Sequence, residues 1–142
     1  MAVTRLVVFG DAQAAAVIVL REALAGRSED CTDGVTVGSL VPGDRSPETP
    51  HLPYVLVRKD TDSPHLSMGT SVVTIRVTVW HEDADAAHDL AQLCQALLVV
   101  HNGPVIRSVR PGTGPIPAVD ATPEKTDLST LTVLANIRPR AI

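Results

Sequence analysis

The side chains best suited to chemistry gather in the middle of the chain, where a strand pattern gives way to a helix pattern. These metal-capable side chains are His81, Glu82, Asp85, His88 and Asp89. A zinc-protease helix needs two histidines four residues apart on one face, with a glutamate beside the first. His81 and His88 are seven residues apart, about 10 Å along a helix, which is too far for both to bind one ion without a distorted backbone. The spacing therefore favours a solvated helix start, and a small metal-dependent enzyme using this cluster is the remote alternative.

Other catalytic signatures are weak in this chain. The glycine-rich stretch 112–115 lacks the Lys-Ser or Lys-Thr pair of a P-loop, and Pro115 removes an N–H that a bound phosphate would need. The sequence contains no Gly-x-Ser-x-Gly elbow and no Cys/His nucleophile pairing, so nothing in it resembles a hydrolase. We therefore expect no enzymatic activity and predict no catalytic, cofactor-binding or metal-binding residue.

The acidic residues of the cluster also have a structural explanation. Residues 71–80 alternate between apolar and polar side chains, which predicts a strand whose buried face consists of Val73, Ile75, Val77 and Val79. Apolar residues then recur at the spacing of an amphipathic helix, at Ala86, Leu90, Leu93, Leu97 and Val100. Free N–H groups and the helix dipole stabilise carboxylates at a helix N-terminus, so either Asp83 or Asp85 is expected to be the N-cap.

An earlier helix is predicted over residues 12–25, with Asp11 as its N-cap and Gly26 as a left-handed C-cap. Its core stripe consists of Val17, Leu20 and Leu24. Ile18 and Val19 point away from that stripe, and a surface helix needs no such additional apolar residues. They indicate either a contact with a second element or subunit, or deeper burial of the helix in its own domain.

The remaining strand patterns are shorter. One begins at Val35, and the others cover residues 54–58, 105–110 and 130–138. Residues 3–9 fit either a short strand or a lead-in to the first helix.

Two polar, proline-containing stretches predict long loops, at residues 59–70 and 111–129. They contain too few apolar side chains to offset their own ordering entropy. We therefore expect both loops to be mobile in an isolated subunit and to become ordered against a neighbour.

These elements succeed one another as a helix, three strands, a helix and two strands. Strands joined by loops favour antiparallel pairing, and two amphipathic helices can cover one face of a sheet. We predict an α+β fold, with a mostly antiparallel sheet of four to five strands and two helices packed on one face. The length of 142 residues suits a single domain that spans residues 1–142.

Composition and charge argue against several classes of function. The formal charge of −4 and the lack of a Lys or Arg run argue against specific binding of nucleic acid. No apolar run is long enough to span a membrane, and the first nine residues lack the features of a signal peptide. We therefore expect a protein that is soluble and cytoplasmic when made, in which Cys31 and Cys94 remain thiols.

The order of several short motifs resembles that of a known family. The helix that Asp11 begins is followed by Val-Thr-Val-Gly-Ser-Leu-Val-Pro at 35–42, Pro-Tyr-Val-Leu-Val-Arg at 53–58 and Val-Thr-Ile-Arg-Val-Thr-Val-Trp at 73–80. Later motifs are Ala-Ala-His-Asp-Leu-Ala at 86–91, Val-Ile-Arg-Ser-Val-Arg at 105–110, Gly114-Pro115 and the strand pattern at 130–138. This arrangement is similar to the tail terminator proteins of long-tailed phages that infect actinobacteria, which are themselves similar to the lambda-type tail terminator.

The resemblance implies a structural role in the virion. Such proteins assemble as a hexameric ring on the head-proximal end of the tail tube, stop tube polymerisation and join the tail to the head-side connector. The implied partners are other copies of the chain, the tail tube protein and a connector or stopper protein, while DNA passes through the ring without specific binding. Another neck component, such as a head-completion or connector-stopper protein, is the alternative.

Ring contacts are expected on the additional apolar face of the first helix and on the two loops. The candidate interface residues are Ile18, Val19, Lys59, Asp60, Asp62, His65, Gly114, Pro115, Ile116, Pro117 and Asp120. The family pattern places a basic and aromatic pair before the last strand, and residues 120–126 lack such a pair.

Overall fold

The protein is described by a computed structural model that covers residues 7–39, 53–62, 71–119 and 127–141. Its elements confirm the α+β class. In chain order they are β1 (Val7–Phe9), α1 (Ala12–Ala25), the short 3-10 helix η1 (Asp30–Thr32), β2 (Thr36–Gly38), β3 (Tyr54–Asp62), β4 (Ser71–His81), α2 (Ala84–Val99), β5 (Ile106–Pro111), β6 (Ile116–Val119), β7 (Asp127–Ile137) and β8 (Pro139–Ala141).

The main sheet has six strands instead of the predicted four to five. Its order is β2-β3-β4-β7-β5, and β6 pairs with the other end of the β7 edge along which β5 lies. All pairings are antiparallel except that of β2 with β3, which is parallel. The stretch 39–53 that separates these two strands exceeds a hairpin loop and is long enough for the crossover that parallel strands need. The expected antiparallel pairing of strands that follow one another in the chain is therefore wrong for β2 and β3, because the short strand patterns do not show which direction a partner strand takes.

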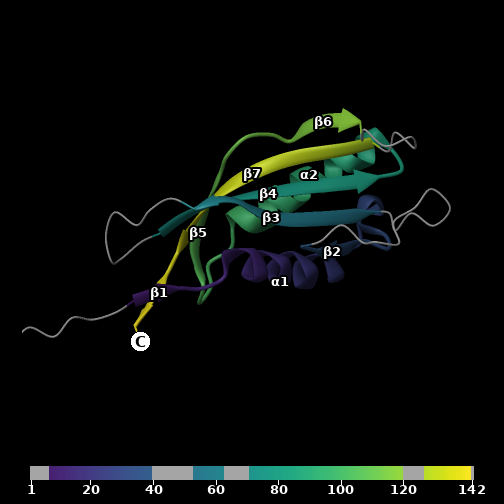
Figure 1. The fold of residues 1–142 in the computed structure, drawn as a ribbon. Coiled ribbons are helices and arrows are strands. Elements are labelled where there is room, and N and C mark those ends of the chain that lie inside the picture. Colours follow the sequence, from purple (N-terminus) through teal and green to yellow (C-terminus); the bar gives the residue numbers. More distant parts are fainter. Residues whose placement is uncertain (1–6, 40–52, 63–70, 120–126, 142) are drawn as a thin grey trace, which may run out of the picture.

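Both helices pack on one face of the sheet, as predicted (Figure 1). The core facing them is aliphatic: Val73, Ile75, Val77 and Val79 of β4 and Leu131, Val133, Ala135 and Ile137 of β7 are all at most 4% exposed. Helix α2 contacts β4, β7 and β5, whereas α1 contacts β2 and β3. The two helices thus divide the sheet between them, and α1 lies at the β2 side.

Aspartates begin both helices. The Oδ1 atom of Asp11 accepts from the Ala14 N–H at 3.0 Å, and the Oδ2 atom of Asp83 accepts from the Ala86 N–H at 3.1 Å. Asp83, and not Asp85, is therefore the second N-cap. Gly26 follows α1 as predicted, but its φ of −92° is not left-handed. The last turn closes instead through short-range bonds from Gly26 and Arg27 to carbonyls three residues earlier.

The predicted loop at 59–70 is wrong where it can be compared. Its first residues, 59–62, prolong β3, whose register against β4 shifts between Lys59 and Thr61. The pairing with β4 supplies hydrogen-bond partners for the backbone of this stretch. Its polar side chains alone do not indicate that pairing. Residues 63–70 lie outside the described part of the chain.

Where the structure describes it, the predicted loop at 111–129 contains parts of three strands. Pro111 ends β5, the strand β6 follows, and β7 begins at Asp127. Between β5 and β6 the chain stays bonded to β7, because the Gly112 N–H donates to the Thr132 carbonyl at 2.9 Å. Prolines are compatible with an edge strand, which is why a proline-rich stretch can still be paired. Residues 120–126 lie outside the described part.

A separate two-stranded ribbon joins the chain ends, where β1 pairs antiparallel with β8. Val7–Phe9 therefore form a strand and not a lead-in to the first helix, while residues 3–6 lie outside the described part of the chain. In β5 the buried side chains do not alternate strictly, because Ile106 and Val109, three residues apart, are both buried. A register shift between Ile106 and Ser108 brings both side chains to the core.

Candidate functional site

The metal-capable side chains lie at the junction of β4 and α2, and one of them, His81, already makes two hydrogen-bond contacts through its ring. The Nε2 atom of His81 lies 3.3 Å from the Cys31 carbonyl oxygen, and its Nδ1 accepts from the Glu82 N–H at 2.9 Å. A metal ion would have to displace one of these contacts. Asp83 caps α2, and within the described residues no three His, Cys, Asp or Glu side chains lie close enough together to hold an ion.

The two cysteines are poorly suited to nucleophilic chemistry. Both are free thiols. Burial raises the pKa of Cys31, and the nearby Asp89 carboxylate adds to this shift. Burial also raises the pKa of Cys94, a buried residue of α2, to about 12. Because the thiolate is the reactive form, both environments disfavour it.

A hollow of about 590 Å³ lies between the end of α1 and η1. Its charged lining includes Arg27, Glu29, Asp30 and Asp33. Arg27 and Glu29 form an ion pair, and the hydrogen bond between them raises the pKa of Arg27 and lowers that of Glu29. The pair neutralises the hollow's basic group, so what remains is an open, acidic surface.

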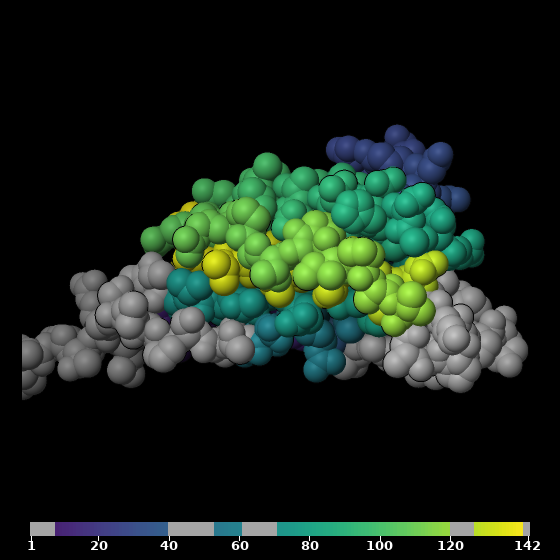
Figure 2. Space-filling model, turned by 90° about the horizontal axis from the view of Figure 1, so that it is seen from above, coloured from purple at the N-terminus to yellow at the C-terminus, as the bar shows by residue number. Residues whose placement is uncertain are grey.

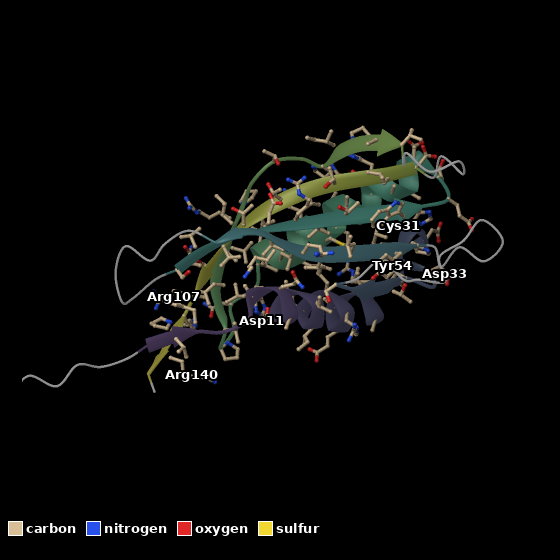
Figure 3. The ribbon with its side chains drawn as sticks, in the orientation of Figure 1. Asp11, Cys31, Asp33, Tyr54, Arg107 and Arg140 are labelled. Atoms are coloured by element: carbon tan, nitrogen blue, oxygen red, sulfur yellow. The ribbon has the colours of Figure 1, made fainter. Side chains whose placement is uncertain are left out.

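Among the described residues, charged side chains are unevenly distributed between the two ends of the strands. Carboxylates gather around η1, the start of α2 and the start of β7, and they are Glu29, Asp30, Asp33, Glu82, Asp83, Asp85, Asp89 and Asp127. The opposite end carries the exposed Arg107 of β5 and Arg140 of β8, neither of which makes an ion pair with a described residue. Figure 3 shows these two arginines at the far end of the molecule from Asp33.

We use the name α1–β2 margin for the edge of the sheet at β2 together with the helix α1 that packs beside it. There Ile18 projects from α1 with 51% of its surface exposed, and Val19 beside it is half-buried. A hollow of about 370 Å³ lies next to Ile18's helix, and it is lined by Arg21, Leu24, Ala25, Val35, Thr36 and Val37. This margin therefore combines an apolar projection with a mostly apolar depression.

We use the name β6 margin for the strand β6, residues 116–119, which lies at the opposite edge of the sheet. All four residues, Ile-Pro-Ala-Val, are exposed, with Ile116 at 53% and Val119 at 57%. Figure 2 looks onto this side and shows β6, in light green, uncovered beside the yellow β7. Four consecutive exposed apolar residues are unfavourable in a free subunit unless they serve a contact.

The remaining predicted interface residues do not join these margins into one patch. The Lys59 N–H donates to the Gln13 side chain at 2.7 Å, and exposed Asp60 forms an ion pair with Arg76 at 3.0 Å. Both lie on β3, which β4 and β7 separate from β6. The side chain of Asp62, and His65 and Asp120, lie outside the described part.

Gly114 and Pro115 lead into β6, so four of the predicted residues, Gly114 to Pro117, fall on or beside one margin. Sequence reasoning missed Ala118 and Val119 of the same strand. The signal was available, since Ile-Pro-Ala-Val is an apolar run that does not alternate and so cannot be a strand with one polar face.

No protein-family model and no curated protein matches the chain. Among the described residues, neither helix is long and apolar enough to cross a membrane.

Proposed function

We propose that this chain, as a single tail-terminator-like domain over residues 1–142, forms a homo-hexameric ring that caps the head-proximal end of a long-tailed phage tail tube. The ring stops polymerisation of the tube and joins the tail to the head-side connector. The observation that carries the proposal is the pair of unlike apolar surfaces on opposite sides of the sheet, the α1–β2 margin with Ile18 and the β6 margin with Ile116 and Val119.

Two unlike surfaces are what a closed ring requires. A two-fold dimer uses one surface twice, whereas a ring joins one surface of each subunit to a different surface of the next. The α1–β2 and β6 margins lie at opposite ends of the strand order β2-β3-β4-β7, so a neighbour on one side leaves the other side free. This arrangement favours a head-to-tail ring over a symmetric pair.

The separation of charge supports a position between two different partners. All subunits of a ring have the same orientation, so their acidic ends gather on one surface and their basic ends, with Arg107 and Arg140, gather on another. Surfaces of opposite charge select different partners and orient their docking. A terminator has two such partners, the tail tube protein and the connector.

The core is compatible with a subunit that gains stability from neighbours. The whole chain has one Trp, one Tyr and one Phe, so its core is mostly aliphatic. Binding to neighbours stabilises a folded subunit by mass action.

The ring assembles in the host cytoplasm and then resides in the neck of the virion.

The test is electron microscopy of particles made without this protein. A terminator leaves overlong tails, because nothing stops the tube. Normal-length tails that are detached from filled heads would instead assign the protein to the head side, as a head-completion or connector-stopper protein. Supplying the wild-type protein in trans should restore both tail length and attachment, which excludes an effect of the deletion on neighbouring components.

A second measurement addresses the enzyme alternative. The double variant His81→Ala and His88→Ala should restore normal tails as well as the wild type does. A variant that fails to do so, and is then rescued by added zinc, would contradict a purely structural role.

A further inference from the structure

We infer that the β6 margin of one copy docks on the α1–β2 margin of a second copy, through side chains and without strand pairing. This inference rests on the proposed ring and names the contact that builds it. Ile116 and Val119 of β6 would cover Ile18 of the neighbouring α1 and fill the hollow of about 370 Å³ between that helix and β2. The occupant of the β6 margin is therefore a second copy of this chain.

The β6 margin is closed to strand addition. A proline fits a paired strand only where its nitrogen faces away from the partner strand, because it has no N–H to donate. Pro117 pairs with Ser129 of β7, so its nitrogen faces outward, where an added strand would need a donor. Proline on an exposed edge is a common protection against unwanted pairing. The apolar side chains of β6 can still contact a neighbour.

The α1–β2 margin is partly protected from strand addition in a different way. The Thr36 N–H faces inward, since it donates to the Pro53 carbonyl at 3.2 Å, so the backbone groups of Val37 face away from β3. The Nη2 atom of Arg21 donates to the Val37 carbonyl at 2.8 Å and occupies that outward acceptor. This edge therefore presents apolar side chains and a hollow to a neighbour, while the outward carbonyl oxygen of Val37 is already hydrogen-bonded.

The exposed apolar residues themselves indicate which surfaces meet. The large exposed hydrophobic residues of the described chain are Ile18, Val100, Ile116 and Val119. Three of the four lie on the two margins, and a contact between the margins removes all three from water. Burial of such apolar area is the main favourable term in most protein association. A contact of either margin with itself would leave the other margin exposed.

The test uses two complementary variants of the full chain. The helix variant is Ile18→Asp, and the edge variant carries both Ile116→Asp and Val119→Asp. Each is expected to be folded by circular dichroism and, in sedimentation velocity, to lack the ring that we expect for the wild-type protein. A 1:1 mixture should regain association as a dimer, because the intact β6 of the helix variant meets the intact α1 of the edge variant. The control Val100→Asp changes the other exposed hydrophobic residue, 79% exposed at the end of α2, and should keep the ring.

Several outcomes would overturn the contact. They are a wild-type protein that stays monomeric at the highest concentration measured, a ring that survives either variant, a mixture that remains monomeric, or a control that fails like the two variants. A homodimer formed by the helix variant alone would indicate that β6 pairs with itself. A variant that is unfolded is replaced by its serine counterpart at the same positions, for which the same outcomes apply.

The contact and the proposed function can fail separately. If the mixture forms the dimer but particles without the protein have tails of normal length, the contact stands and the terminator role falls. If those particles have overlong tails but the ring survives both variants, the role stands and the ring is built by other surfaces.

Discussion

Strands β4 and β6 are both rich in apolar residues, but they use them in opposite ways. In β4 the apolar side chains alternate with polar ones, the strand is paired on both sides, and Ile75 and Val77 are at most 1% exposed. In β6 every residue is apolar and exposed, and the strand is paired only with β7 in the described structure. Apolar content alone therefore does not place a strand in the core. A strand lies in the core when its apolar and polar side chains alternate and it is paired on both sides. An apolar strand that lacks these two features is available for a contact with another molecule.

The largest expected effect concerns the buried face of β4. Replacing Ile75 with Asp would bury an unpaired carboxylate among aliphatic side chains, and should destabilise the domain by more than about 4 kcal/mol. Because a domain is stable by only about 5–15 kcal/mol, the variant should be largely unfolded or insoluble. Circular dichroism and urea denaturation measure this. Thr74→Asp, on the opposite face of the same strand, is the control and should fold; equal tolerance of both changes would show that the two faces of β4 do not differ.

A smaller effect is expected at Gly114, the residue that leads into β6. A substitution there tests how firmly the backbone of β6 is held, independently of its exposed side chains. Gly114 has a φ of 86°, and a Cβ there would lie 2.5 Å from the Thr130 carbonyl oxygen. Gly114→Ala should therefore cost about 1–3 kcal/mol and lower the melting temperature. Gly26→Ala is the matched control, because its φ is negative and its Cβ would meet only one atom, at 3.8 Å. If both variants melt together, the edge is not held in the described conformation.

The smallest effect is expected for the side chains of β6 in a subunit that cannot assemble. In an Ile18→Asp background, adding Ile116→Asp should change the free energy of unfolding by less than about 1 kcal/mol, because the side chain is already half in water. Urea denaturation of the two proteins gives the difference. A loss as large as that of Ile75→Asp would mean that β6 belongs to the core, and the comparison with β4 would fail.

The candidate interface was only partly accessible to prediction. Ile18 could be found, because it departs from the core stripe of a helix whose period is clear. Lys59 was assigned to a loop contact, yet it lies in β3 with its N–H bonded to Gln13, forty-six residues away in the chain. Val119 was overlooked, because the prolines around it indicate a loop when the sequence is read without its partner strand. The errors thus arise where a distant segment supplies the hydrogen bonds.

The sequence by itself determined the elements that have a strong period of their own. Helix α1 with its Asp11 cap, helix α2, and the buried faces of β4 and β7 follow from local spacing, because a side chain's direction repeats every 3.6 residues in a helix and every two in a strand. Only the tertiary structure decided that β2 pairs parallel to β3, that β6 completes the edge of β7, and that Ile18 and Val119 lie on opposite margins. Strand partners and edges depend on contacts between segments far apart in the chain, which no local period encodes.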